Sequence, residues 1–288
     1  MSGTIGTPKD PPGPRPTRGP FFSIVTPSLN QAQFLGDALA SVRGQRLPAY
    51  EHIIIDGGSA DGTLGILQDA SSNVRYVVEP DEGQSDALNK GLQMTSGTII
   101  GWLNADDFYL PGAFHAVEEY FASNPDVQVV YGDAVVVDAS GRVIRGLQQH
   151  GFDARILLYY GCFIPSTSTF FRSELIDTGL LHFDTTLHFT MDLELFLRLA
   201  AAGVRFGHMR RDLAACRWHP QAKGQVDSRP GIAERRRVEK QYGAMGTDGL
   251  AQKALYRSFQ AAHGLRKVLA GSYWRQLRWS RARGTSLL

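Results

Sequence analysis

Residues 99–114 read "IIGWLNADDFYLPGAF", in which a strand-like apolar run ends at two adjacent acids, Asp106 and Asp107. Two carboxylates in a crevice share a proton, pair with a basic side chain or bind a hard divalent cation such as Mg²⁺. No Lys or Arg lies between Lys90 and Arg142, so the partner comes from elsewhere in the chain or is a metal ion. A purely structural alternative is that Asp107 caps the next helix.

Apolar runs of strand length alternate with helical patterns on both sides of this stretch. The runs are apolar on both faces, which is typical of parallel strands covered by helices on two sides. The sequence therefore predicts an α/β fold with a mostly parallel central sheet flanked by helices. The predicted strands of the first half lie within residues 21–29, 50–56, 74–80 and 97–107, and a strand pair with a turn at residues 139–141 follows.

Polar residues collect directly after these strands, where open α/β sheets bind their ligands. The segment "DGGSADGT", residues 56–63, matches neither the dinucleotide-binding fingerprint nor the phosphate-loop motif. Its glycines let the backbone approach a ligand closely, and Asp56 can accept hydrogen bonds from a base or ribose. The alternative is an ordinary turn in which Ser59 or Asp61 caps the next helix.

The net charge of +2 hides a strong asymmetry along the chain. Residues 1–228 carry 17 basic and 25 acidic residues, whereas residues 229–288 carry 13 basic and 3 acidic residues. A basic tail interleaved with aromatic residues indicates an anionic partner, and we expect residues 249–284 to meet an anionic membrane surface. A solvated tail, a helix packed on the main domain and an oligomer contact are the alternatives. No nucleic acid is expected, because no recognition motif accompanies the charge.

The chain contains neither an apolar run long enough for a membrane span nor an apolar signal core at its N-terminus. Cys162 and Cys216 lie outside any metal-ligand spacing and are expected to be buried free thiols of a reducing compartment. We therefore expect a cytoplasmic protein, with the inner face of the membrane as a candidate site of attachment. The predicted organisation is a disordered Pro-rich leader (residues 1–20), a main domain (21–228) and a basic helical extension (229–288).

Five segments follow one another in the order found in family 2 glycosyltransferases, and the chain resembles that family over roughly residues 20–220. The resemblance implies the GT-A fold, a nucleotide-diphospho-sugar-binding α/β domain, for residues 21–228. It also implies an inverting transfer of a hexosyl or related sugar, with Mn²⁺ or Mg²⁺ as cofactor. The segments read "FFSIVTPSLNQAQFLGDALASVRGQ", "HIIIDGGSADGTLGIL", "EPDEGQSDALNKGL", "SGTIIGWLNADDFYLPGAF" and "FTMDLELFLRLAAAG".

The same resemblance implies roles for individual residues. Asp106 and Asp107 match the acidic D-x-D motif that holds the metal in the family. Asn104 departs from the usual pattern, because it keeps an oxygen ligand or a hydrogen bond but lacks the charge of an aspartate. The donor nucleotide-sugar would be contacted by Pro27, Asn30, Asp56, Gly83, Gln84, Asp86, Asn89, Asn104 and Asp106.

An inverting transfer needs a carboxylate that takes the proton of the acceptor hydroxyl. The family pattern implies that Asp192, at the start of an amphipathic helix, is this general base. Without the resemblance, capping of that helix is its simplest role, worth about 1 kcal/mol. Arg217, His219 and Lys223 lie on a polar segment that would fold over the donor and contact the diphosphate or the metal. The candidate acceptor contacts are Thr167 and Ser168, and the alternative is that both are buried strand residues.

The implied substrates are a nucleotide-diphospho-sugar donor and a glycan or glycolipid acceptor, by analogy an envelope, lipid-linked or polysaccharide glycan. A nucleotidyltransferase on a similar fold is one alternative. That class needs a Gly-rich loop with Arg and Lys near the N-terminus, whereas residues 26–35 read "TPSLNQAQFL" and have neither. A non-catalytic sugar-nucleotide or glycan-binding module is another. The presence of Asp192 together with Asp106 and Asp107 favours an enzyme, because a binding module has no need of a base.

Overall fold

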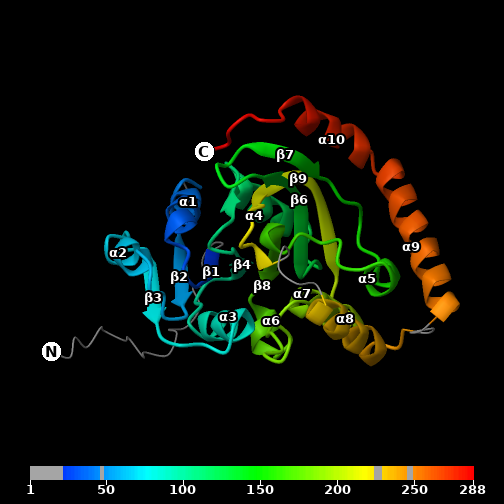
Figure 1. Ribbon diagram of the computed structural model, residues 1–288, viewed down its shortest axis with the longest axis horizontal. Helices are drawn as coiled ribbons and strands as arrows, with labels where there is room; N and C mark the ends of the chain where they lie inside the picture. The colour runs from blue at the N-terminus through cyan, green and yellow to red at the C-terminus, as the bar shows by residue number, and fades with distance from the viewer. Residues whose placement is uncertain (1–21, 46–48, 224–228, 245–248) are drawn as a thin grey trace.

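A single sheet of nine strands forms the centre of the protein within the described residues, which are 22–45, 49–223, 229–244 and 249–288 of this computed structural model (Figure 1). The strands are β1 (Phe22–Ser28), β2 (Tyr50–Asp56), β3 (Val74–Val78), β4 (Ile99–Trp102), β5 (Phe108–Tyr109), β6 (Val129–Val137), β7 (Val143–Leu147), β8 (Thr169–Arg172) and β9 (Phe206–Arg217). Their spatial order is β3-β2-β1-β4-β8-β6-β9-β5, and β7 pairs with β6. The leader expected at residues 1–20 lies outside the described residues.

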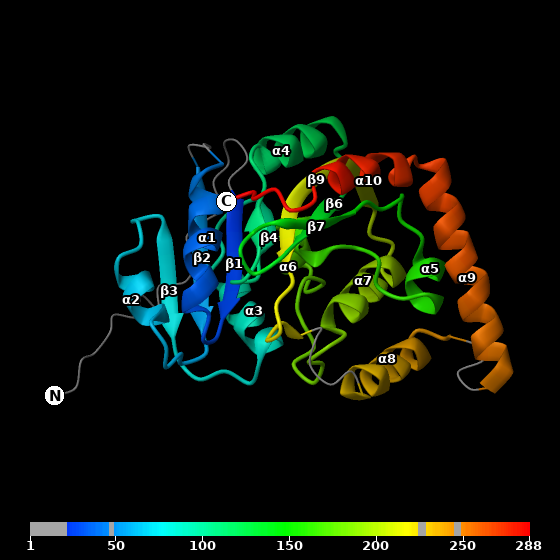
Figure 2. The same ribbon diagram turned by 45° about the horizontal axis from the view of Figure 1, so that its top comes forward.

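Helices cover the sheet on both sides, so the predicted α/β architecture is confirmed (Figure 2). The helices are α1 (Ala32–Arg43), α2 (Thr63–Gln68), α3 (Gln84–Gln93), α4 (Ala113–Ser123), α5 (Ala154–Tyr159), α6 (Glu174–Asp177), α7 (Met191–Ala201), α8 (Arg229–Gln241), α9 (Gly249–Leu269) and α10 (Ser272–Arg281), with a 3₁₀ turn, η1, at Ser166–Ser168.

The first half of the sheet is parallel and sets the position of the candidate site. β1 pairs in parallel with β2 and with β4, with Ser28 opposite Asp56 and Val25 opposite Trp102. Because parallel strands end at the same edge, the loops that follow these strands meet there. The second half is mixed, since β8 runs antiparallel to both β4 and β6 while β9 runs parallel to β6.

Two apolar clusters fix the helices on opposite faces of this sheet. On one face, the ring of Phe22 stacks on that of Phe114 of α4 with a centroid distance of 4.5 Å. On the other face, Trp102 belongs to the cluster that also contains Leu88 of α3 and Phe196 of α7. The loop between β4 and α4 is thereby held from both sides, and this loop carries the two adjacent acids.

The C-terminal helices run along one side of the molecule (Figures 1 and 2). The ring of Phe259 in α9 stacks on Tyr159 of α5 at 4.8 Å, and Trp279 of α10 is buried against β6 and β7. No helix in the described part of the chain combines the length and the apolar character needed to cross a membrane. Both cysteines are free thiols, but Cys162 is exposed and Cys216 half-buried, so the expectation that they are buried is wrong; Cys162 lies on the loop after α5.

Candidate active site

A cavity of about 580 Å³ lies where the loops after β1 and β4 meet the start of α7. Polar and apolar residues from several separate parts of the chain line it, as expected for the carboxyl edge of an open sheet. Among the residues singled out in the sequence, those that line it are Pro27, Gly83, Gln84, Asn104, Asp106, Asp107, Thr167, Asp192, Arg217 and Lys223.

Asp107 is the buried member of the acid pair, with 5% of its surface exposed. Its Oδ1 accepts a hydrogen bond from the backbone N–H of Arg217 at 2.8 Å. Its Oδ2 accepts from the hydroxyl of Thr167 at 2.6 Å and from the side-chain amide of Asn104 at 3.0 Å. Burial and the neighbouring Asp106 raise the pKa of Asp107, and the three donors oppose that rise. Asp107 therefore ties the loop after β4 to β9 and η1.

Asp106 is the accessible member of the pair, with 21% of its side chain exposed. Its Oδ2 lies 3.0 Å from Nε2 of His219, whose ring packs against Phe34. A carboxylate and an imidazole are both ligands that Mn²⁺ accepts, and Mg²⁺ takes one or two carboxylates. Within the described residues, no group of three or more His, Cys, Asp and Glu side chains is gathered as a metal site. The pair can supply two ligands, so a metal here would need the rest of its shell from water and substrate.

Asn104 makes one contact that an ionised aspartate could not make, a hydrogen bond donated to Asp107. Its Oδ1 accepts from the indole N–H of Trp102 and from the amide of Gln84, each at 2.8 Å, and its Nδ2 donates to Asp107. An aspartate at this position would lose the donor and bring a second charge to the oxygens of Asp107.

Arg217, predicted to meet a diphosphate, is held inside the protein. Its guanidinium donates to Asp37 at 2.8 Å and to the backbone carbonyls of Asp106 and Ala139. It also lies over the ring of Phe34 at 4.6 Å. Because these contacts occupy its nitrogens, Arg217 mainly supports the loop after β4. Lys223 is exposed, and its Nζ donates to Oε1 of Gln84 at 3.0 Å. Lys223 is therefore more accessible to a ligand in the cavity than Arg217 is.

Asp192 is the second residue of α7 and lines the same cavity. Its Oδ1 accepts the backbone N–H of Leu193 at 2.7 Å, which is a local contact at the start of the helix. Burial raises the pKa of the Asp192 carboxyl, and the positive charge of Lys223 acts in the opposite direction. A carboxylate whose pKa is raised by its surroundings is a better proton acceptor than an exposed one.

Glu234 of α8 was not singled out in the sequence, yet it holds the segment just before Asp192. Its carboxylate accepts the backbone N–H groups of three consecutive residues, His188 at 2.9 Å, Phe189 at 2.7 Å and Thr190 at 3.1 Å. These donors lower the pKa of the Glu234 carboxyl, although burial opposes them. No sequence signal marks this contact, because its partners are backbone groups far away along the chain.

Gly83 precedes α3 with φ of +113°, a conformation that other residues rarely adopt. A Cβ added there would lie 3.2 Å from the His188 ring, so the turn also needs the missing side chain. The backbone N–H of Gly83 donates to Asp81. This turn thereby brings the start of α3 close to the segment that precedes α7.

Five predicted donor or acceptor contacts lie outside the lining of this cavity, and each has a partner within the protein. Asn30 accepts the N–H of Ala60, and Asp56 accepts the N–H groups of the two residues of its own turn, Gly58 and Ser59. Asp86 pairs with Lys90, and Asn89 bonds both backbone groups of Phe183. Ser168 donates to the carbonyl of Asp133. These side chains shape the loops and helices around the cavity.

Residues 23–192 match the family model described as Glycosyl transferase family 2. The chain belongs to this family. The acidic loop after β4, which lines the cavity at the edge of the parallel strands, lies within the matched residues. The predicted family resemblance is confirmed.

Known relatives of this family 2 chain cover parts of its length. A PGL/p-HBAD biosynthesis glycosyltransferase of Mycobacterium bovis is 34% identical over 122 residues, which cover 41% of this chain and 48% of the relative. The chain thus spans about half the length of these curated relatives. An uncharacterized glycosyltransferase of Mycobacterium tuberculosis is 30% identical over 187 residues, 64% of this chain and 70% of the relative.

Solved structures show the fold at lower identity. Residues 1–349 of S. aureus TarS in complex with UDP-GlcNAc superpose with a TM-score of 0.63 at 16% identity, covering 83% of this chain and 71% of that one. The mannosyltransferase PcManGT from Pyrobaculum calidifontis, in complex with GDP-Man and Mn²⁺, gives 0.57 at 19% identity, covering 88% and 77%. The family 2 chain has the GT-A fold.

Proposed function

We propose that this family 2 member transfers a hexosyl or related sugar from a nucleotide-diphosphate donor to a hydroxyl group, with inversion at the anomeric carbon. The observation that carries the proposal is that Asp106 and Asp192 line one cavity at the edge of the parallel strands, while the buried His219, which does not line it, contacts Asp106. The family match supports a glycosyltransferase, and the bound UDP-GlcNAc of TarS and GDP-Man of PcManGT support a nucleotide-sugar as donor.

The proposed cofactor is Mn²⁺ or Mg²⁺, held by Asp106 with His219 as second ligand. The accessible carboxylate oxygen beside an imidazole fits such an ion, whereas both oxygens of Asp107 are engaged by protein donors. When bound, the cation would offset the negative charge that grows on the leaving diphosphate. Asp107, the other predicted ligand, is then assigned to holding the loop that presents Asp106.

The proposed general base is Asp192. It would take the proton of the acceptor hydroxyl as that oxygen attacks the anomeric carbon from the face opposite the diphosphate. Its partial burial favours proton uptake, and Lys223 nearby would offset charge on the departing group or on the carboxylate. Thr167 lines the cavity, but its hydroxyl donates to Asp107 and is therefore not free for the acceptor.

The wider proposals concern the organisation and the acceptor. We assign catalysis to residues 21–228 and treat residues 229–288 as an extension that supports it through Glu234. The acceptor is proposed to be an envelope, lipid-linked or polysaccharide glycan, reached from the cytoplasmic side of the membrane. An acceptor at a membrane agrees with the basic character of the extension.

A thermal-shift screen of UDP-, GDP- and dTDP-sugars, with Mn²⁺ or with a chelator, tests the proposed donor and cofactor. A ligand at 100 times its Kd stabilises the folded state by about 2.7 kcal/mol, which is a shift of several degrees. We expect one nucleotide class to stabilise the protein and the chelator to reduce the shift. Asp106→Asn should lose the metal-dependent part, whereas Asp126→Asn, an exposed carboxylate outside the cavity, should keep it. Equal shifts in both variants would contradict the assignment.

A further inference from the structure

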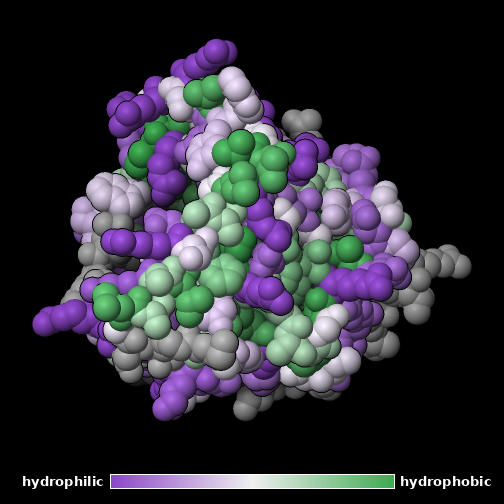
Figure 3. All heavy atoms as spheres, turned by 90° about the vertical axis from the view of Figure 1, so that its right-hand side faces the viewer, coloured by the Kyte–Doolittle hydropathy of each residue, from purple (hydrophilic) through white to green (hydrophobic). Residues whose placement is uncertain are grey.

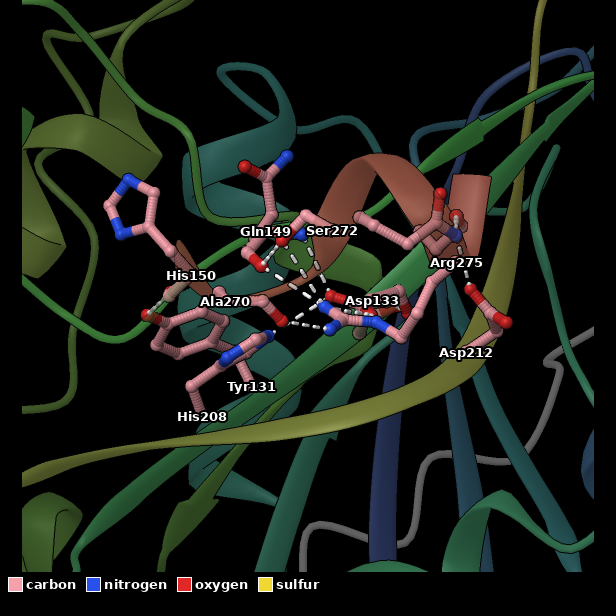
Figure 4. Close-up of polar contacts among 12 residues, drawn as sticks. Tyr131, Asp133, Gln149, His150, His208, Asp212, Ala270, Ser272 and Arg275 are labelled. Carbon is pink, nitrogen blue, oxygen red and sulfur yellow. Dashed lines mark hydrogen bonds and ion pairs between the residues drawn. The ribbon is translucent and has the colours of Figure 1, made fainter. Parts of the chain in front are cut away.

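Helix α10 is fastened to the sheet by a buried polar cluster (Figure 4). The carboxylate of Asp133 in β6 is 1% exposed and accepts from Arg275 of α10 at 3.1 Å and from His208 of β9 at 3.0 Å. The Arg275 guanidinium also donates to the backbone carbonyls of Gln149 and Ala270. A buried ion pair with these additional bonds fixes one orientation of the helix.

Further contacts hold the same two helices. Asp212 of β9 accepts from the indole of Trp279 at 3.0 Å and from Arg278 at 2.7 Å. In α9, the ring of His263 is 2.9 Å from His150 and is buried. The inner sides of α9 and α10 are thus engaged with the rest of the protein, and their outer sides point in a fixed direction.

The outer sides of α9 and α10 expose large apolar residues. Trp274 is 78% exposed and Leu269 is 76% exposed, which are high values for side chains of this size. Figure 3 looks onto this side and shows hydrophobic side chains gathered along it with hydrophilic ones between them. The apolar face is defined by Leu265, Val268, Leu269, Tyr273, Trp274 and Leu277.

The charge on this segment has one sign only. Residues 249–288 contain eight Lys and Arg and no Asp or Glu. Lys253, Arg257 and Arg281 are exposed, so part of this charge can meet a partner outside the protein. A hollow beside Trp274 and Leu277 is also lined by Arg281, which sets apolar and basic groups side by side.

We propose that the apolar face and the basic rim, defined as the exposed Lys253, Arg257 and Arg281 of the same two helices, form a docking surface for an anionic lipid bilayer. Exposed Trp and Leu suit the boundary between headgroups and acyl chains, and Lys and Arg suit anionic headgroups. The surface goes beyond the proposed transfer reaction and does not depend on it.

The charge pattern favours a bilayer over the other partners. A symmetric pair of chains would bring two faces together that carry basic residues and no acids, so like charges would repel each other. A nucleic acid would satisfy the basic rim but would leave the aliphatic residues Leu265, Val268 and Leu269 without a partner.

Cosedimentation of the full chain with vesicles tests the surface. Vesicles of phosphatidylcholine with phosphatidylglycerol should bind the protein, those of phosphatidylcholine alone should bind it more weakly, and added salt should release it. The variant Leu269→Ser, Trp274→Ser, Leu277→Ser should lower binding about tenfold or more, because each side chain buries apolar area in the interface. The variant Lys253→Gln, Arg257→Gln, Arg281→Gln should lose about tenfold and most of the preference for phosphatidylglycerol.

Matched controls keep the test decisive. Arg43→Gln with Arg210→Gln, two exposed basic residues of α1 and β9, should bind vesicles as the unaltered chain does. Trp274→Phe should still bind but should show weaker quenching of tryptophan fluorescence by brominated lipid, a readout that needs no change in fold. Unaltered vesicle binding by the apolar and basic variants would overturn the proposal. So would a vesicle-independent dimer abolished by the serine variant, or binding to an oligonucleotide in preference to vesicles.

Discussion

The side-chain amide of Asn104 donates a hydrogen bond to Asp107 Oδ2 at 3.0 Å. The residue at which the acidic loop departs from the family pattern therefore donates to the buried acid. Its oxygen in turn accepts from Trp102 and Gln84, so both ends of the amide are used. The loop that carries Asp106 is held in shape by this amide rather than by a metal ion alone.

Asn104→Asp should destabilise the protein. The change places a second carboxylate about 3 Å from a buried one and removes a donor, which costs about 2 kcal/mol. Thermal unfolding at neutral pH should show a clear loss. The deficit should shrink near pH 5, where the introduced carboxyl group can take up a proton and donate again. A variant as stable as the unaltered chain at neutral pH would contradict this role.

Glu234→Gln should slow turnover more than it weakens donor binding. The carboxylate of Glu234 holds the backbone of residues 188–190, so its loss would loosen the start of α7 and misplace Asp192. A drop in kcat of about tenfold, with KM for the donor nearly unchanged, is the expected result. Glu239→Gln, on the same helix and paired with Arg235, is the matched control. If both changes lowered kcat equally, Glu234 would only stabilise the protein and would not position Asp192.

Acid should weaken the attachment of α9 through His263. Burial lowers the pKa of His263 to about 4, so its folded-state pKa lies below the value near 6.5 of the unfolded chain. Between these values the unfolded state binds more protons, and the contribution, complete above about pH 6.5, is lost as pH falls toward 4. The shifted pKa of His263 alone should lower the free energy of unfolding by about 2 kcal/mol between pH 7 and pH 5. Urea denaturation should show a smaller difference in the free energy of unfolding between pH 7 and pH 5 for His263→Gln than for the unaltered chain. The same pH dependence in both proteins would contradict this role of His263.

Arg275→Ala should destabilise the protein by about 2 kcal/mol. It leaves the buried Asp133 without its main cationic partner, and the cost is reduced because a quarter of the Arg275 side chain is exposed. Hydrogen exchange should speed up in α10 before it does in β1. The exposed Arg281→Ala is the control and should change the free energy of unfolding by less than about 0.5 kcal/mol. Similar losses in both variants would argue against the buried cluster as the anchor.

Much of the fold was predictable from apolar runs. Strands β1, β2 and β4 are buried on both faces, so a continuous apolar stretch marks each of them, and the loop acids follow directly. The antiparallel placement of β8 between β4 and β6 was not predictable, because its partners are distant in sequence and leave no local pattern.

The sequence predicted which types of residue form the site better than it predicted the contacts that each residue makes. Asp106 and Asp192 reach the cavity from strand and helix ends that the sequence marks. Asn89 instead bonds the backbone of Phe183, and Asp56 accepts hydrogen bonds within its own turn. These partners are backbone groups, which every residue type provides except for the N–H that proline lacks, so no sequence pattern marks the contacts. The alternative for that turn, in which Ser59 or Asp61 is the N-cap of the helix, is wrong, since the N-cap of α2 is Gly62 with no side-chain cap.

The most direct test compares donor binding with sugar transfer in Asp192→Asn. Calorimetry with the nucleotide-sugar found in the screen measures binding, and release of the nucleoside diphosphate in the presence of acceptor measures transfer. The substitution keeps the size of the side chain and removes the base. Donor affinity should stay within about threefold, while turnover falls by a factor of about 10²–10⁴. Turnover equal to that of the unaltered chain would contradict Asp192 as the base and with it the proposed site.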